Sequence, residues 1–292
     1  MTKLLDPTTP TESAIQSALG PEFISKSFLP MRSPSSGIRP EFLQSEMLSP
    51  TAELLDELER KSRELENAAP EEILRWVTSR FGDRFTMATA FGPEGMCILH
   101  MLAEIAPSTY VFNLDTGYQF KETLELCERV AERYGMRIDL RQPATTVAEY
   151  ERLHGGPVYQ TNPNQCCADR KIRVLEQTVK GFHAWASAIR RDQSADRSVV
   201  PIVGWDKKFG LVKVSPLANW TKKDVWKKIL DNSIPYNPLH DQGYPSIGCW
   251  PCTRAVLFGE DDRAGRWSGT AKTECGLHSL DEPKPPPISG SL

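Results

Sequence analysis

Five cysteines in the second half of the chain are the residues best suited to chemistry. Cys166 and Cys167 are adjacent, Cys249 and Cys252 form a C-x-x-C pair, and Cys275 stands apart. Two tight pairs of thiols indicate a metal site, because thiolates bind soft metal ions. A lone thiol near basic residues indicates a nucleophile, since nearby cations favour the reactive thiolate. The cysteines together therefore favour a redox enzyme.

Three interpretations of the four paired thiols stay open. They could be ordinary buried cysteines, the ligands of a zinc ion, or the ligands of a cubane iron–sulfur cluster. Four-thiolate zinc sites usually use two C-x-x-C pairs, and the adjacent Cys166 and Cys167 fit one tetrahedral ion poorly because neighbouring side chains diverge. Adjacent cysteines can each reach a different iron of a larger cluster. The spacing therefore favours the cluster over zinc.

Cys275 differs from the remaining cysteines in its surroundings. It lies in a polar stretch, residues 272–278, and Arg263 and Arg266 precede it. An exposed, inert thiol is the alternative interpretation. A nucleophile here has no obvious resolving cysteine, so a thioredoxin- or glutaredoxin-like dithiol would have to reduce it. Cys97 and Cys127 lie in expected amphipathic helices and are expected to be core residues.

Basic residues gather in three places, although the formal net charge of the whole chain is only -3. Each group taken singly is explained by a solvated surface. Two of the groups flank the proposed chemical sites, and arginine binds phosphate and sulfate oxygens in bidentate fashion, so an anionic substrate is favoured. The groups are Arg170, Lys171 and Arg173; Arg190, Arg191 and Arg197; and Arg263 and Arg266.

The composition excludes several classes of protein. The near-neutral charge gives no support to a nucleic-acid or membrane partner, and no apolar run approaches the ~20 residues of a membrane span. Seven cysteines without an export signal indicate a reducing compartment, so we expect a cytoplasmic protein. Residues 1–50 hold seven Pro and nine Ser and are expected to be a disordered lead. A transit peptide is the alternative, which the acidic residues of this stretch oppose. A homo-oligomer is left open.

The elements that must position these residues follow a strand–helix rhythm. Helices are expected at 51–67, from 70 onward, at 95–105, 120–134 and 221–230. The last is expected to begin with a variant capping box, with Thr221 as N-cap and Asp224 as the third helical residue. Strands are expected at 85–91, 110–114, 137–140, 184–189, 199–203 and 211–214. This alternation predicts an α/β fold with an open, doubly wound, mostly parallel sheet. Ligands of such sheets bind at the carboxyl ends of the strands, where residues 89–95 and 115–117 form loops. Simple turn chemistry is the alternative for both loops.

The motifs together resemble the assimilatory sulfonucleotide reductases, the adenylyl-sulfate (APS) and phosphoadenylyl-sulfate (PAPS) reductases. The resemblance covers residues 70–280, and Glu-Cys-Gly-Leu-His at 274–278 is its most specific part. The other matching pieces are Thr-Ala-Phe-Gly at 89–92, Leu-Asp-Thr-Gly at 114–117, Cys-Cys-Ala-Asp-Arg-Lys at 166–171, Arg-Arg-Asp-Gln-Ser at 190–194 with Arg197, Ile-Pro-Tyr-Asn-Pro-Leu-His at 234–240, Gly-Tyr-Pro-Ser-Ile-Gly-Cys-Trp-Pro-Cys-Thr at 243–253 and Arg-Ala-Gly-Arg-Trp at 263–267.

The resemblance implies a role for each matching position. Cys275 would attack the sulfur of the sulfonucleotide, release AMP and carry a thiosulfonate, from which thioredoxin would free sulfite. The four paired cysteines, Cys166, Cys167, Cys249 and Cys252, would hold a [4Fe-4S] cluster. Lys171 would lie between cluster and substrate, and Arg197, Arg263 and Arg266 would bind the phosphosulfate with His278 close by. The adenosine would lie against Thr89, Phe91, Gly92, Leu114, Asp115, Thr116 and Gly117.

The family also implies a fold and a division of the chain. A sheet of the PP-loop, adenine-nucleotide α-hydrolase-like type would occupy residues 51–255 with the iron–sulfur site. A mobile C-terminal segment, residues 256–292, would carry Cys275. Plant enzymes of the family have a C-terminal thioredoxin-like domain that is lacking here, so a separate reductant is implied.

Alternative interpretations exist for the preferred substrate and for the class of reaction. The cluster cysteines favour APS, whereas the first loop, Thr-Ala-Phe-Gly-Pro-Glu-Gly, is closer to cluster-free PAPS reductases than to the Ser-rich loop of cluster-bearing ones. PAPS reduction or dual use is therefore the alternative. A PP-loop ATP pyrophosphatase is a remote rival, because Gly95 stands where its acidic residue would be. A cluster-based redox sensor or nucleic-acid binder lacks support in a chain without a basic, aromatic-rich face.

Overall fold

The computed structural model describes residues 47–270, 272 and 277. All of them fall in the second of two units of the chain, Ile38–Leu292. The lead expected at residues 1–50 lies outside the described residues apart from its last four positions. None of the helices in this described part is long and apolar enough to cross a membrane.

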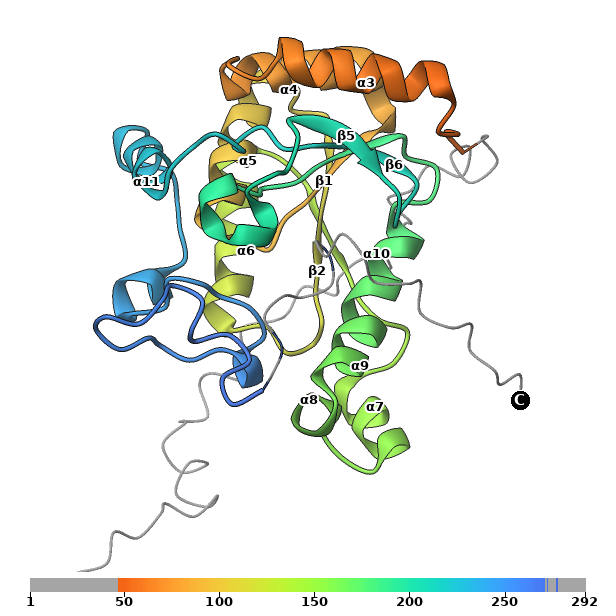
Figure 1. Cartoon of the computed structure of the whole chain (residues 1–292). Coiled ribbons are helices and arrows are strands. Elements are labelled where there is room, and N and C mark those ends of the chain that lie inside the picture. The colour runs from red at the N-terminus through yellow and green to blue at the C-terminus, as the bar shows by residue number, and fades with distance from the viewer. Residues whose placement is uncertain (1–46, 271, 273–276, 278–292) are drawn as a thin grey trace, which may run out of the picture. The chain divides into compact units, whose positions relative to one another are not determined.

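A six-stranded sheet with the order β3-β2-β1-β4-β6-β5 forms the centre of the fold (Figure 1). All neighbouring strands are parallel except β5 and β6, which are antiparallel at one edge. From β1 the chain builds outward to β2 and β3 on one side and continues through β4 on the other. Ligands bind where the strand order reverses in this way. The strands are β1 (Phe85–Ala88), β2 (Tyr110–Leu114), β3 (Ile138–Arg141), β4 (Ala184–Ala186), β5 (Val203–Asp206) and β6 (Leu211–Val214).

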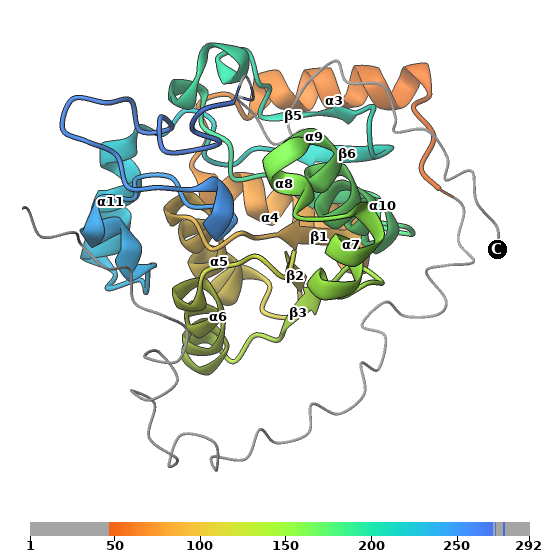
Figure 2. The same ribbon diagram turned by 90° about the horizontal axis from the view of Figure 1, so that it is seen from below.

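Helices cover both faces of the sheet. Figure 2 shows α5 and α6 on one side of β1, β2 and β3, and the group from α7 to α10 on the other. Two separate apolar clusters fill the two layers, one joining α4, α5, α6 and α11 to the sheet and one joining α10 to it. The helices are α3 (Ala52–Glu64), α4 (Pro70–Phe81), α5 (Pro93–Ile105), α6 (Lys121–Tyr134), α7 (Val147–His154), α8 (Val158–Thr161), α9 (Pro163–Cys167), α10 (Arg173–Thr178) and α11 (Lys222–Asp231).

Local sequence signals explain where several helices begin. The Thr51 side chain accepts a hydrogen bond from the Leu54 amide and starts α3. Thr221 and Asp224 form the expected capping box of α11, and Thr146 and Glu149 form another at α7. Each of these pairs satisfies backbone amides that the helix itself leaves without partners.

The expected fold class, an open, doubly wound and mostly parallel α/β sheet, is confirmed. The strands expected at 110–114 and 211–214 have those bounds. The strand expected at 199–203 is wrong in position, because β5 starts only at Val203. Pro201 lacks the amide that a ladder needs, which explains the later start. The helices between β3 and β4 were not expected from the sequence.

Candidate active site

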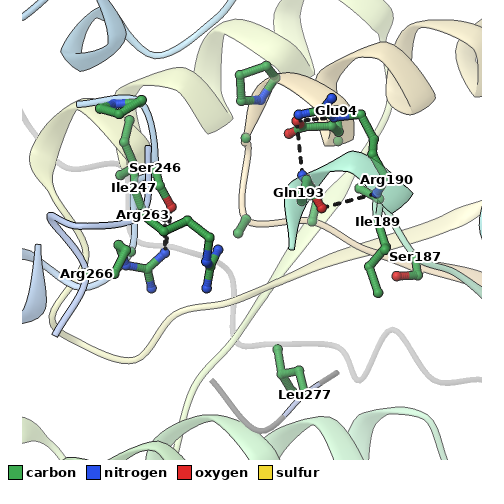
Figure 3. A pocket seen from close by; sticks show the side chains of 18 of the residues that line it. Glu94, Ser187, Ile189, Arg190, Gln193, Ser246, Ile247, Arg263, Arg266 and Leu277 are labelled. Carbon is green, nitrogen blue, oxygen red and sulfur yellow. Dashed lines mark hydrogen bonds and ion pairs between the residues drawn. The ribbon is translucent and has the colours of Figure 1, made fainter. Parts of the chain in front are cut away.

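A cavity of about 460 Å³ opens at the carboxyl ends of β1, β2 and β4 (Figure 3). Loops that follow these strands form one part of its lining, including Thr89, Thr116 and Ser187. The chain after α11 forms another part, including Ser246 and Arg266. The cavity therefore lies at the switch point of the sheet, where the strand order predicts a ligand site.

The loop after β1 folds tightly against the start of α5. Phe91 is buried and has a φ of 56°, a left-handed conformation that is rare for an aromatic residue. Its amide donates a hydrogen bond of 3.0 Å to the Thr89 hydroxyl. A Cβ at Gly95 would lie 3.0 Å from the same hydroxyl oxygen. The glycine therefore lets the loop approach the helix, and Gly92 begins the helix at the cavity wall.

The loop after β2 links the cavity to the cysteines. Asp115 accepts hydrogen bonds from the Gly117 amide, at 2.9 Å, and from the Gln142 side chain, at 2.7 Å. The Thr116 hydroxyl lies 3.2 Å from the Cys249 thiol. Thr116 lines the cavity and also the smaller void that the cysteines surround. Thr116 thus lies between the cavity and the thiols, and Cys249 itself lines both spaces.

All four paired cysteines line this smaller void. Cys166 and Cys167 end α9, directly before a π-helix at Ala168–Ile172. Cys249 directly precedes a 3-10 helix at Trp250–Cys252, whose last residue is Cys252. The Trp250 amide between the two cysteines donates to the Tyr118 carbonyl at 2.8 Å. The fold therefore brings together two cysteine pairs that are far apart in the sequence.

Burial shapes the acidity of these thiols. It raises the pKa of Cys166 to about 12 and that of Cys252 to about 11, and the neighbouring thiols add to the rise by repelling negative charge. Thiols of this kind are protonated at neutral pH unless a metal stabilises the thiolate, so metal binding would release protons.

The donor set of the paired cysteines matches the ligand chemistry of an iron–sulfur cluster. In the described part of the chain, no group of three or more His, Cys, Asp and Glu side chains is placed to hold one metal ion. Four thiols line a common void without an Asp, Glu or His side chain among them. Thiolates alone are the usual ligands of a [4Fe-4S] cluster, which needs them spread around a larger body.

Six lysine and arginine side chains line the large cavity, among them Arg190 and Lys222. The other four are the cations that the resemblance places near the substrate. Of these four cations, Lys171 and Arg266 also line the void of the cysteines, whereas Arg197 and Arg263 line the cavity only. The Arg266 guanidinium donates to the Ser246 hydroxyl at 3.2 Å and lies 4.5 Å over the Trp267 ring. Its Nε is buried and has no hydrogen-bond partner among the described residues. The arrangement offers fixed positive charge to an anion beside the cysteines.

A further group of cavity residues has no role assigned from the sequence. Glu94 accepts hydrogen bonds from Arg190 Nε at 2.9 Å and from Gln193 at 3.2 Å. Asp192 and His240 also line the cavity. Both His240 ring nitrogens are buried without a well-formed hydrogen bond, and burial lowers the pKa of this ring. An acidic residue at the start of a helix that follows a strand is a local sequence feature by which Glu94 could be found. No local feature indicates that its side chain contacts Arg190 and Gln193.

The structure brings many of the proposed substrate residues to one cavity. Thr89, Gly92, Leu114 and Thr116 line it together with the four cations. The side chain of Phe91 instead belongs to the core, and Asp115 shapes its loop through the hydrogen bonds given above. Leu277 lines the cavity as well, but Cys275 and His278 lie outside the described residues. Cys97 and Cys127 are buried core residues, as expected.

Comparison with known proteins yields consistent matches. The family model "Phosphoadenosine phosphosulfate reductase domain" matches residues 84–255. The phosphoadenosine 5'-phosphosulfate reductase of Gloeobacter violaceus is 44% identical over 225 residues, which cover 76% of this chain and 93% of the relative. The adenosine 5'-phosphosulfate reductase of Shouchella clausii is 45% identical over 222 residues, covering 76% and 92%. The crystal structure of a PAPS reductase from Candida auris in a phosphate complex gives a TM-score of 0.63 at 28% identity, covering 72% of this chain and all of that one.

Proposed function

This chain belongs to the phosphoadenosine phosphosulfate reductase domain family, and on that premise we propose that it is a thioredoxin-dependent adenylyl-sulfate reductase of assimilatory sulfate reduction. One observation carries the proposal most directly. A single cavity at the switch point of the sheet joins both nucleotide loops to four cations and, through Thr116, Lys171 and Arg266, to the paired cysteines. Such a cavity suits a nucleotide with one strongly anionic end.

The proposed reaction has two steps. The Cys275 thiolate attacks the sulfur of APS, forming an S–S bond while the bond from sulfur to the phosphate oxygen breaks and AMP leaves. A thioredoxin dithiol then attacks the thiosulfonate, which frees sulfite, restores the Cys275 thiol and leaves thioredoxin oxidised to its disulfide. The charge that builds on the leaving phosphate is the charge that Arg263 and Arg266 would stabilise.

The nucleophile is tested by substitution. Cys275→Ser is expected to lower sulfite production by about three orders of magnitude or more, because a hydroxyl replaces the thiolate that forms the intermediate. Cys127→Ser is the matched control, since Cys127 is buried on α6 away from the cavity lining. Mass spectrometry of the wild-type protein with APS alone should show a thiosulfonate adduct. Full sulfite production by the Cys275 variant would remove the covalent mechanism.

The preference for APS over PAPS is a separate part of the proposal. Curated relatives of similar identity carry both names, so the names alone do not choose. The four paired cysteines of this chain support APS as the substrate. Their proposed cluster is the feature that we associate with reductases of APS rather than of PAPS. Anaerobic turnover with both nucleotides and reduced thioredoxin gives the two values of kcat/KM, and a higher value for PAPS would reverse the preference.

We further propose that Cys166, Cys167, Cys249 and Cys252 hold a [4Fe-4S] cluster. When bound, the cluster would supply a charged body next to Lys171 and Arg266 and would fix the two cysteine pairs relative to each other. Anaerobically purified protein is expected to be brown and to contain about four irons per chain. Stoichiometric zinc without iron would instead support the single-ion alternative.

The partner and the compartment follow from the chemistry. The thiosulfonate needs an external dithiol, for which thioredoxin or glutaredoxin is proposed, and both act in the reducing cytoplasm. Replacing reduced thioredoxin by glutaredoxin with glutathione in the same assay identifies the donor. Sulfite formation with neither dithiol would contradict this part of the proposal.

A further inference from the structure

The wall of the cavity at the start of α5 has an electrostatic character opposite to that of the four cations. Figure 3 shows Glu94, Arg190 and Gln193 on one side of the cavity and Arg263 and Arg266 on the other. Resting on the proposed function, we propose that Glu94 makes this wall reject nucleotides that carry a second phosphate on the ribose. Glu94 is thus a specificity-determining residue for APS over PAPS.

Arg190, the cation of this wall, already has two carboxylate partners. The Arg190 side chain is only 6% exposed, and its Nε donates to Glu94 at 2.9 Å while its Nη1 donates to Asp192 at 2.6 Å. Two carboxylates therefore share one guanidinium, which leaves the group with a net negative charge. A phosphate that approached Arg190 would have to displace either Glu94, whose side chain is only 17% exposed, or Asp192, which is 41% exposed. Breaking a buried pair in this way is costly, because it leaves a charge without its partner.

Neighbouring groups do not reverse this negative charge. The Lys222 ammonium is paired with Asp262 at 2.7 Å, and the Lys222 backbone amide donates to Asp192 at 3.2 Å. Burial lowers the pKa of His240, so its ring is neutral at neutral pH and adds no positive charge. Arg197 contacts this wall through Gln193. A second phosphate placed next to Glu94 would thus face the repulsion of that carboxylate.

The position of Glu94 relative to the proposed nucleotide explains why the ribose would feel it. Glu94 follows Gly92 by two residues, and Gly92 belongs to the loop that we expect to hold the adenosine. Gln193 connects the wall to the anion end, because its amide donates to Glu94 and its oxygen accepts from Arg197 at 2.5 Å. The ribose of a nucleotide between the loop and Arg197 would therefore lie close to Glu94.

The test measures binding without turnover. Isothermal titration calorimetry of the full-length protein with AMP and with adenosine 3',5'-bisphosphate gives a ratio of two dissociation constants. The wild-type protein is expected to bind AMP more tightly. In Glu94→Gln the ratio should shift about tenfold toward the bisphosphate, the change that about 1.4 kcal/mol produces. The kcat/KM ratio for PAPS and APS should move the same way.

A matched control separates the local effect from the loss of any ion pair. Glu260 pairs with Arg254 at 2.7 Å in the same manner but does not line the cavity, so Glu260→Gln should leave the ratio unchanged. If Glu94→Gln does not fold, Asp192→Asn removes the second carboxylate from the same guanidinium and should shift the ratio in the same direction.

Two results would overturn the inference. One is an unchanged ratio in a folded Glu94→Gln protein, and the other is a ratio that moves only because AMP binding weakens, since that would show Glu94 to be a positioning residue. Failure of the proposed function looks different: the wild-type protein would then make no sulfite from either nucleotide, whatever the binding ratio.

Discussion

Thr116 contacts three parts of the site, two through its hydroxyl and one through its backbone carbonyl. The hydroxyl lies 3.2 Å from the Cys249 thiol and accepts a hydrogen bond from the Tyr118 amide at 3.2 Å. The backbone carbonyl of the same residue accepts from Arg170 Nε at 2.6 Å. Hydrogen bonds to a thiolate stabilise its negative charge, so this hydroxyl is expected to strengthen metal binding by Cys249.

Thr116→Val tests this contact, because valine has nearly the same shape but no hydroxyl. We expect the free energy of unfolding to fall by about 1–2 kcal/mol, since a buried amide loses its acceptor. We also expect anaerobically purified protein to lose iron faster during dialysis against a chelator. Thr123→Val is the control, because Thr123 also lines the cavity and accepts a hydrogen bond, from Asn237, away from the cysteines. Equal iron loss in the two variants would contradict the role of Thr116.

At the residue scale, the sequence indicated which residues could do chemistry but not which side chains contact one another. The paired cysteines were recognisable from their types and spacing, and Cys97 and Cys127 were recognisable as core residues from the helices around them. Glu94 and Arg190 are separated by 96 positions, and no local pattern reports that their side chains meet. Such contacts depend on how β1 and β4 lie side by side, which is a property of the whole sheet.

Gly117 shows how an element is held in place by its neighbours. Its φ is 78°, and a Cβ there would lie 2.6 Å from Val147 Cγ2 and 3.1 Å from Arg170 Nη2. The loop after β2 is thus pressed between the start of α7 and the π-helix that follows the adjacent cysteines. π-Helical turns are often found at functional sites, and here the turn presents Arg170 to the loop.

Gly117→Ala is expected to disturb the site as well as the stability. Gly135 provides a matched control, because its φ is 62° and nothing lies within 4 Å of a Cβ there. Gly135→Ala should cost only the left-handed conformation, about 1–2 kcal/mol of unfolding free energy. Gly117→Ala should cost about 1–3 kcal/mol more, the usual range for an overpacked site, and should raise KM for the nucleotide. Denaturant titration and steady-state kinetics measure both, and equal losses in the two variants would contradict the packing argument.

At the element scale, strongly patterned segments were predictable and context-dependent ones were not. The capping box at Thr221 was recognised in advance, and its equivalent at Thr146 was present in the sequence but overlooked. The short helices around the adjacent cysteines carry little periodicity of their own, and their form depends on packing against the loop at Gly117. The late start of β5 reflects Pro201, whose ring would lie 2.9 Å from a Cβ at Gly204.

At the scale of the whole molecule, the strand order of the sheet determines where the candidate site lies. The order of strands puts β1 and β4 side by side, and the segments that follow these two strands meet at the cavity wall in the group of Glu94, Arg190 and Asp192. The chain after α11 then returns to cover the same edge with Arg263 and Arg266. The strand rhythm predicted this edge as the site, whereas the fold of the described residues after α11 was beyond pattern reasoning, because their regular elements are two short 3-10 helices.

Two half-buried histidines give the molecule a specific sensitivity to acid. His100 contacts the Tyr134 hydroxyl, and His240 packs against the Trp226 ring. Burial is the main reason that the pKa of each ring is lowered; Glu104 beside His100, and Glu94, Asp241 and the Tyr244 backbone beside His240, act in the other direction. Lys228 and Arg133 near His100, and Lys222 near His240, lower the pKa further.

The sign of the effect follows from linkage. A histidine with a lowered pKa in the folded state takes up its proton more readily when unfolded, where its pKa is about 6.5. The stability from His100 and His240 is therefore fully present above about pH 6.5 and is lost as the pH falls toward the folded-state values. The lowered pKa values of carboxylates such as Glu57 and Glu66 matter only below their ordinary value of 4.5. Between pH 7.5 and 5.5 the histidines should thus dominate.

The free energy of unfolding from urea titrations is expected to be lower at pH 5.5 than at pH 7.5 in the wild-type protein. In the double variant His100→Gln and His240→Gln this dependence should be much weaker, because glutamine does not titrate, even if the variant is less stable at both pH values. An identical pH dependence in the wild-type protein and the double variant would show that other groups cause the loss.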